Sequence, residues 1–131
     1  MQISVIDVSE ARLVLSAPLA PNINHRRTAF GGSVSAMAIL SAWALLHTRL
    51  REAGVDARLV IQRNTVHYDL PITGTFTATA SAPVDGMWET FLRTFSRRGK
   101  ARIAVSSVLE YDGAVAARFE GWFVALAPSA C

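Results

Sequence analysis

Several features that mark other classes of protein are scarce or missing in this chain of 131 residues. Its one cysteine, Cys131, is the last residue, so neither a disulfide framework nor a cysteine-based zinc site can be built, which suits a reducing cytoplasm. Residues 1–7 lack a basic region followed by an apolar run, so we expect no signal peptide. The apolar stretch 29–46 is interrupted by two glycines and three serines, and we expect it to be a buried helix rather than a membrane span.

The basic residues are almost all arginines, because the chain holds a single lysine, Lys100. The formal net charge is +3, which permits a mild preference for acidic partners. We expect no nucleic-acid binding, since the aromatic residues follow apolar periodicities and are not interleaved with the basic ones. No linker, repeat or low-complexity stretch is present, so residues 1–131 are expected to form one domain.

Acidic residues are absent from the whole stretch between Pro21 and Arg51. Within it, the only polar side chains from Val34 to Leu46 are two small serines, Ser35 and Ser41. A helix that is apolar all round must be covered all round. We therefore expect a curved sheet wrapped around one long helix.

The rest of the chain reads as short strands and one short helix. Asp112-Gly113 is a strong hairpin signal, and Gly54 and Gly99 are natural caps for helices that end just before them. Met87, Phe91 and Phe95 are four apart and predict one helical face, with Trp88 and Leu92 beside them. We predict strands at 10–17, 57–69, 75–82, 101–111 and 114–126, and helices from Gly31-Gly32 to about Ala53 and over 87–98.

Residues 1–8 read as a strand or edge coil, and residues 57–69 and 75–82 as two successive antiparallel strands. Hairpins combined with one buried helix indicate an α+β fold with an antiparallel sheet.

Two segments then carry a resemblance to a known family: Pro18-Leu19-Ala20-Pro21-Asn22-Ile23-Asn24 and Thr28-Ala29-Phe30-Gly31-Gly32-Ser33. They resemble the YiiD C-terminal family, which has the hot-dog fold, is labelled putative thioesterase, and is linked to decarboxylation of malonyl-acyl-carrier-protein. Weaker matches follow at 68–71, 97–102 and 119–124, so that the resemblance covers about residues 9–126. It implies an antiparallel sheet around one helix and a dimer or larger homo-oligomer whose sheets join edge to edge.

Asn24, Gly31 and Gly32 are our catalytic candidates. The N-terminus of a helix offers unpaired backbone N–H groups and partial positive charge, so Gly31 and Gly32 could hold the oxygen of a thioester carbonyl. Alternatively, the two glycines only let the helix pack tightly against the sheet. Asn24 can donate its amide N–H to the same oxygen, and it resembles the family position tied to decarboxylation.

The acid-free helix bears on the reaction. Many hot-dog thioesterases place a carboxylate there as nucleophile or base. Decarboxylation of a malonyl thioester needs no base, because the departing carbon dioxide leaves electrons that pass into an enolate on the thioester oxygen. We therefore expect a malonyl-acyl-carrier-protein decarboxylase. One alternative is an acyl-CoA or acyl-carrier-protein thioesterase that uses an acid of the partner chain, such as Asp69. Another is a non-catalytic module that binds an acyl carrier. A dehydratase is weaker still, because it needs a histidine and acid pair.

The basic cluster around Arg97, Arg98 and Lys100 suits a coenzyme A phosphate or an acidic acyl carrier, or is simply a solvated face. Asn22 follows two prolines, which favours a turn-building role for it. His25 could act as acid, base or substrate ligand, or be a solvated loop residue. The predicted substrate-binding residues are Asn22, His25, Phe30, Ser33, Met37, Asn64, Tyr68, Arg97, Arg98 and Lys100.

No histidine has a second ligand at metal spacing, so we expect no metal site. We also expect no cofactor beyond the coenzyme A or phosphopantetheine that belongs to the substrate. The protein is expected in the cytoplasm, as a dimer in which the loop 22–28 faces the partner's residues 64–69. No membrane partner is expected.

Overall fold

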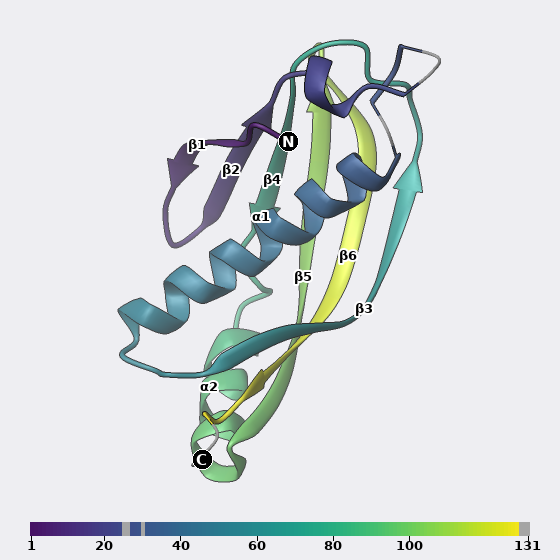
Figure 1. Ribbon diagram of the computed structural model, residues 1–131. Coiled ribbons are helices and arrows are strands. Elements are labelled where there is room, and N and C mark those ends of the chain that lie inside the picture. Colours follow the sequence, from purple (N-terminus) through teal and green to yellow (C-terminus); the bar gives the residue numbers. More distant parts are fainter. Residues whose placement is uncertain (25–26, 30, 129–131) are drawn as a thin grey trace.

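The computed structural model describes residues 1–24, 27–29 and 31–128, and it has an α+β architecture (Figure 1). One sheet of six antiparallel strands has the order β1-β2-β4-β5-β6-β3. The strands are β1 (Ser4–Val8), β2 (Arg12–Ala17), β3 (Arg58–Tyr68), β4 (Phe76–Ser81), β5 (Lys100–Tyr111) and β6 (Ala114–Leu126). The helices are η1 (Ala20–Asn22, a 3-10 turn), α1 (Gly31–Glu52) and α2 (Met87–Arg98).

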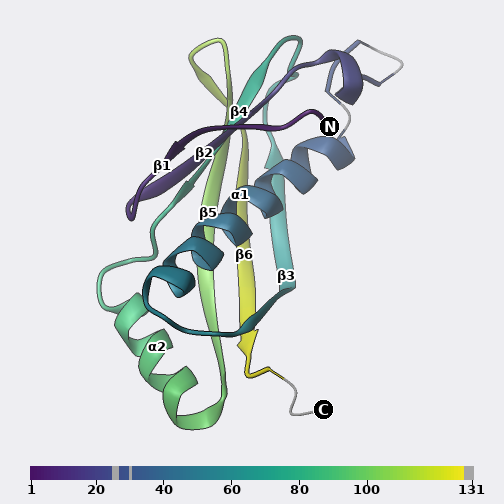
Figure 2. The same ribbon diagram turned by 60° about the vertical axis from the view of Figure 1, so that its left-hand side comes forward.

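The sheet curves around α1, which crosses its inner face (Figures 1 and 2). Side chains that recur every three or four residues on α1 meet the sheet and are fully or almost fully buried: Val34, Met37, Ala38, Ser41, Ala42, Leu45 and Leu46. Alternate residues of the central strands face them, among them Ile103, Val105 and Leu109 of β5. The hot-dog arrangement expected from the sequence is confirmed.

The covering of α1 is incomplete, which corrects the expectation of a helix enclosed on every side. Ala36 and Leu40 point away from the sheet, and Leu40 is 40 % exposed. One sheet can cover only one side of a helix, and nothing in the described part of the chain covers the other side at these two residues. The residues that the structure describes include no helix with both the length and the apolar character needed to cross a bilayer.

The helices and strands end at the glycine caps and turns that the sequence predicted. Gly99 has φ of 69°, and its N–H donates to the Phe95 carbonyl over 2.7 Å, so it caps α2. The turn between β5 and β6 places both Asp112 (φ 53°) and Gly113 (φ 76°) in the left-handed region, as a two-residue hairpin requires. On α2 Phe91 is buried and Phe95 and Leu92 pack against the core, as predicted. Met87 is 44 % exposed, and Trp88 beside it is buried instead.

The strand order makes β1 and β3 the two edge strands of the sheet. β3 and β4 are successive antiparallel strands, as predicted, but they are not neighbours, because β5 and β6 lie between them. β3 pairs only with β6, so the other edge of this 11-residue strand has no partner strand in the described chain. Trp43 of α1 fixes β3 in place by donating from Nε1 to the Leu59 carbonyl over 2.9 Å.

Candidate functional site

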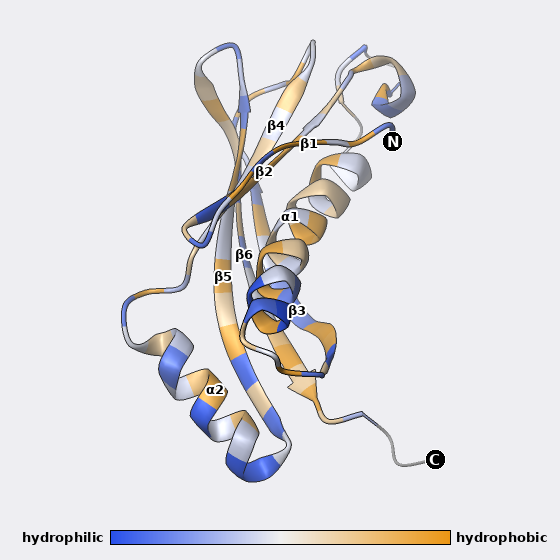
Figure 3. Ribbon diagram, turned by 90° about the vertical axis from the view of Figure 1, so that its left-hand side faces the viewer, coloured by the Kyte–Doolittle hydropathy of each residue, from blue (hydrophilic) through white to orange (hydrophobic). Residues whose placement is uncertain are grey.

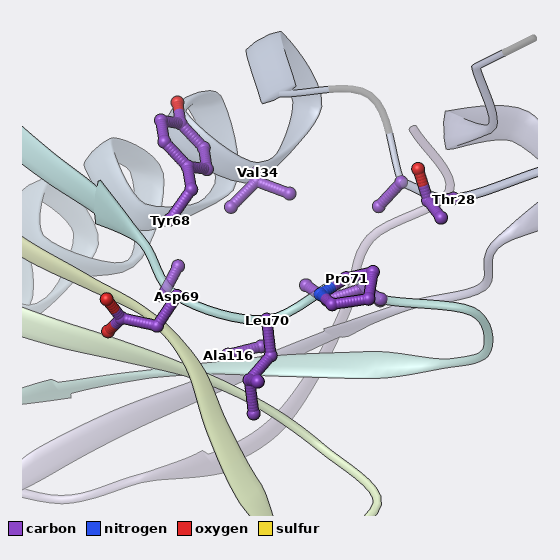
Figure 4. A pocket seen from close by; sticks show the side chains of 10 residues that line it. Thr28, Val34, Tyr68, Asp69, Leu70, Pro71 and Ala116 are labelled. Atoms are coloured by element: carbon purple, nitrogen blue, oxygen red, sulfur yellow. The ribbon is translucent and has the colours of Figure 1, made fainter. Parts of the chain in front are cut away.

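A cavity of about 300 Å³ opens at the first turn of α1 (Figure 4). Val34 lines it from the helix, and the segment that follows β3 lines it from the sheet. Figure 4 shows Val34, Thr28 and Pro71 pointing toward one another across this space. The lining residues are Thr28, Ala29, Val34, Tyr68, Asp69, Leu70, Pro71, Ile72, Ala116 and Ala117.

Backbone hydrogen bonds hold the walls of this cavity together. The N–H groups of Asp69 and Leu70 both donate to the Ala116 carbonyl, over 2.8 and 3.0 Å. The Ala29 N–H donates to the Ile72 carbonyl over 2.8 Å, which joins the chain entering α1 to the chain leaving β3. Three segments far apart in the sequence therefore form one wall.

Asn24 closes the loop that precedes the helix. Its Oδ1 accepts from the Thr28 N–H over 3.1 Å, and its Nδ2 donates to Thr28 Oγ1 over 2.9 Å. The Asn24 N–H also donates to the Thr28 carbonyl over 2.8 Å. Asn24 thus lies beside the cavity and positions Thr28, which lines it.

The electropositive start of α1 lies beside the cavity, and the helix lines the cavity through Val34. The first N–H groups of a helix have no partner within the helix, and the helix dipole adds partial positive charge there. No acidic residue of the first turn offsets that charge. Tyr68 Oη donates to the Gly31 carbonyl over 3.1 Å and so fixes the end of β3 against this turn. A carbonyl oxygen that reached this turn could accept from the helix N–H groups.

Asp69 is the only carboxylate among the described residues that line the cavity. Its Oδ2 accepts from Arg118 Nε over 2.9 Å, and this hydrogen bond, with the guanidinium charge, holds the pKa of Asp69 below its usual value. Figure 4 shows the carboxylate turned away from Val34 and Thr28. Asp69 is therefore ionised at neutral pH but does not point at the helix N-terminus.

Only some of the predicted site residues lie at or near this cavity. Tyr68 lines the cavity, whereas Gly31, Gly32 and Ser33 form the first turn of α1 beside it and are not among the lining residues. Asn22 is 2 % exposed and donates from Nδ2 to the carbonyls of Met1 and Pro18, over 3.1 and 2.8 Å, which is the turn-building role that the prolines indicated. The predictions for His25 and Phe30 fall outside the described residues.

Met37 lies in the core with no exposed surface and does not line the cavity. Val34, one turn earlier, takes the place that the sequence assigned to Met37. Asn64 is exposed on β3, on the same face as Tyr68, because residues four apart on a strand share a face. Asn64 belongs to the edge strand β3 and is not among the residues that line this cavity.

The basic residues lie elsewhere. Arg98 and Lys100 line a separate groove near the end of α2, and Arg97 is exposed beside them. Sequence reasoning had joined them to the catalytic residues as one substrate site, and the structure places them at the other end of β6. Among the described residues, no cluster of three histidine, cysteine or acidic side chains could hold a metal ion.

Several lining residues were missed. Ala116 and Ala117 have small apolar side chains with no chemical signature, and only the pairing of β6 with β3 brings them to the site. Pro71 was recognised only as the end of a strand, although the proline turns the chain across the cavity. Thr28 stood within a recognised motif, but its bonds to Asn24 are visible only in the structure.

Comparisons with known proteins agree with this fold. Residues 1–127 match a family model described as "Putative thioesterase (yiiD_Cterm)". A Chlorobaculum tepidum protein of unknown function has a similar structure, with a TM-score of 0.94 and 28 % identity, covering 98 % of this chain and 84 % of that chain. A putative thioesterase from Shewanella oneidensis has a TM-score of 0.85 and 29 % identity, and the match covers 96 % of this chain and 85 % of that chain. A Pseudomonas aeruginosa protein described as a probable thioesterase has a TM-score of 0.83 and 20 % identity, and the match covers 96 % of this chain and 83 % of that chain. At this identity the similarity shows the fold alone.

Proposed function

This chain belongs to the YiiD C-terminal family of putative thioesterases, and we propose that it hydrolyses acyl thioesters in the cavity at the start of α1. The observation that carries the proposal is the electropositive first turn of α1 beside a cavity whose walls combine apolar side chains with Thr28, Tyr68 and Asp69. A thioester carbonyl seated there is polarised by N–H groups that need no reorganisation as charge develops on its oxygen. Asn24 acts with them by holding Thr28 at the rim.

Hydrolysis also requires a group that activates water. Asp69 is our candidate, because it is the carboxylate of the cavity wall and is ionised at neutral pH. In this reaction water adds to the carbonyl carbon, Asp69 takes one proton of that water, the C–S bond breaks and the sulfur leaves as a thiol after protonation. The products are a carboxylic acid and the free thiol of coenzyme A or of a carrier phosphopantetheine.

One observation favours a second reaction, decarboxylation of a malonyl thioester. Asp69 is turned toward Arg118 and away from the cavity centre, so the described walls aim no base at the substrate. Loss of carbon dioxide needs only a stabilised enolate oxygen and apolar surroundings for the carboxylate. Val34, Ile72 and Ala117 provide those surroundings.

We also propose that the working unit is a dimer joined along β3. The unpaired edge of that strand can add a second copy of itself. Val60 on the strand is 42 % exposed, and Leu40 lies uncovered on the nearby helix. Pairing the two β3 strands would cover both residues and bring the partner's edge strand toward the loop before α1.

Mass spectrometry of an acyl carrier protein distinguishes the two reactions. Malonyl- and hexanoyl-loaded carriers are incubated with wild type and with the variants Asp69→Asn, Asn24→Ala and Asp56→Asn, the last a matched control on an exposed acid outside the cavity. Hydrolysis yields unacylated carrier, and we expect Asp69→Asn to slow it at least about a hundredfold while Asp56→Asn does not.

Loss of carbon dioxide from the malonyl carrier alone, unaffected by Asp69→Asn and abolished by Asn24→Ala, would instead assign the decarboxylase. A wild-type protein that leaves every thioester intact, with coenzyme A thioesters included, would contradict both reactions.

A further inference from the structure

A groove of about 490 Å³ lies where the end of α2 meets the first residues of β5. Its walls come from four elements, because Val124 belongs to β6 and Gln62 to β3. Figure 3 shows hydrophilic residues gathered at this end of the molecule, where α2 turns into β5. The lining residues are Gln62, Thr94, Arg98, Lys100, Ala101, Arg102 and Val124.

This groove opens on the outer face of the sheet, whereas the cavity at α1 opens on the inner face. Val124 pairs with Arg102, which is exposed, and Val124 itself is buried without belonging to the core around α1. Ala117, which lines the cavity at α1, pairs with Leu109, a fully buried residue of that core. The sheet therefore separates the two hollows, and a molecule in the groove is not the thioester bound in the cavity.

A tight turn brings the cations of the groove together. Gly99 ends α2 in the left-handed conformation, and its carbonyl accepts from the Ala127 N–H over 2.8 Å. The chain turns from helix to strand at this one residue, which sets Arg98 of α2 close to Lys100 and Arg102 of β5. Three positive charges thus line one hollow.

The walls of the groove hold no counter-charge for these cations. No acidic side chain is among the described lining residues, and Arg98 and Lys100 form no ion pair with any residue that the structure describes. Arg102 contacts the Trp122 ring, with its guanidinium carbon 5.3 Å from the ring centroid, which restricts where it can point. The helix dipole favours a cation at the C-terminus of α2 and so accounts for Arg98, but not for the two cations of β5.

We propose that this groove binds a small phosphate monoester that is not the substrate of the enzyme. A phosphate monoester carries close to two negative charges at neutral pH and has three acceptor oxygens, so it matches three cations better than a single carboxylate does. Arginine forks contact phosphate oxygens at two points, and a lysine adds a point charge. The proposal does not depend on the reaction proposed above.

The other walls indicate what the phosphate is attached to. A bare phosphate ion would fill only part of the groove, whose volume is within the range of small-molecule sites. Val124 offers an apolar surface, and the amide of Gln62 offers both a donor and an acceptor. The organic part of the ester is therefore small and partly apolar. A membrane phospholipid matches less well, because its phosphodiester carries only one negative charge.

A bound ester would join the edge strand to the rest of the sheet. Gln62 lies at the bulge of β3, where the pairing with β6 shifts between Ile61 and Arg63. A ligand that contacts Gln62 together with Arg98 and Arg102 connects β3 to α2 and β5. The ester should therefore raise the Tm of the protein, by an amount that grows with its concentration.

Binding of phenyl phosphate tests the groove without requiring turnover. Calorimetry compares wild type with Arg98→Gln, Arg102→Gln and a matched control, Arg51→Gln, an exposed arginine at the end of α1. We expect each groove variant to raise the Kd of phenyl phosphate about tenfold and the control to leave it unchanged. Benzoate keeps the ring but carries one charge, and it should bind wild type at least about tenfold more weakly.

Backbone NMR then locates the bound ester. Phenyl phosphate should shift the amide signals of residues 100–102 and of Val124. Shifts concentrated at residues 31–34 would place the anion at the start of α1 and overturn the proposal. So would a wild type that binds no phenyl phosphate, or an unchanged Kd in both groove variants.

Vesicles separate a soluble ester from a lipid head group. Binding only to vesicles that contain phosphatidylglycerol, and not to phenyl phosphate, would identify a membrane surface and refute a small-molecule site. Circular dichroism identifies any variant that fails to fold, and Lys100→Gln then replaces it. A wild type that binds phenyl phosphate in the groove yet cleaves no thioester would refute the proposed reaction and leave the groove assigned.

Discussion

Tyr68 and Gly31 join the end of β3 to the first turn of α1, through a hydrogen bond of 3.1 Å from the tyrosine hydroxyl to the glycine carbonyl. Tyr68 lines the cavity, and its ring lies against Gly31. The position of the helix N–H groups relative to the strand therefore depends on one side chain that is 56 % exposed.

Tyr68→Phe should impair activity more than stability. The substitution keeps the ring and removes an exposed hydrogen bond, which contributes about 0.5–1.5 kcal/mol at most. The first turn of α1 is then less firmly placed, and we expect kcat to fall about tenfold. Tyr111→Phe is a matched control, since Tyr111 also loses one hydroxyl contact, from Thr73, but does not line the cavity. Equal loss of activity in the two variants would refute a specific role for Tyr68.

The Asp69 and Arg118 pair should make stability depend on pH. Arg118 lowers the pKa of Asp69 below the usual 3.8, mainly through their hydrogen bond. A lowered carboxyl pKa stabilises the folded state above the unfolded pKa, and this contribution is lost as the pH falls through the folded pKa. The Tm of Arg118→Gln should therefore lie below that of wild type near neutral pH, and the difference should close as the pH falls through the lowered pKa of Asp69. Thermal unfolding followed across that range measures it.

Arg63→Gln is the control for this measurement, because it removes an exposed arginine of the adjacent strand without breaking the pair. A gap between Arg118→Gln and wild type that is constant across the pH range would show that the pair does not cause it.

Ser41 and Ser107 should show strong energetic coupling in the core. Their hydroxyl oxygens are 2.8 Å apart, and Ser41 also donates to the Ala38 carbonyl over 2.8 Å, so Ser107 donates to Ser41. Ser41→Ala leaves the Ser107 hydroxyl buried without its acceptor and should cost about 1–3 kcal/mol. The double alanine variant removes both groups and should cost less than the sum of the single variants. Urea unfolding of the four proteins gives this cycle, and strict additivity would contradict it.

Local signals predicted the elements of this fold well, because their physics is local. Gly99 ended a helix and Asp112-Gly113 formed a hairpin, since each needs only a left-handed backbone position. The side of α1 that remains uncovered depends instead on which strands reach the sheet edge. Leu40 and Met37 are equally apolar in the sequence, and only the packing makes one exposed and the other buried.

The sequence predicted only those parts of the candidate site that lie in recognisable local segments. Gly31 and Tyr68 lay in recognisable segments and do meet in the structure. Asp69 and Arg118 are 49 residues apart, and no periodicity links them before β3 and β6 are paired. Lys100 lay in a cluster whose charge was evident, but charge alone does not tell which cavity it faces. Residues that act through long-range pairing were therefore missed or misplaced.

The uncovered face of α1 leads to the last prediction, that Leu40→Arg weakens self-association. Leu40 is 40 % exposed, and a second copy that pairs along β3 would bury it. A guanidinium in that apolar interface loses water without gaining a partner charge, so the dissociation constant should rise about tenfold or more. Analytical ultracentrifugation at several concentrations measures the effect, with Arg51→Gln on the same helix as a control for charge. A wild type that stays monomeric at high concentration would contradict the dimer. Unchanged association in Leu40→Arg would place the interface on another face.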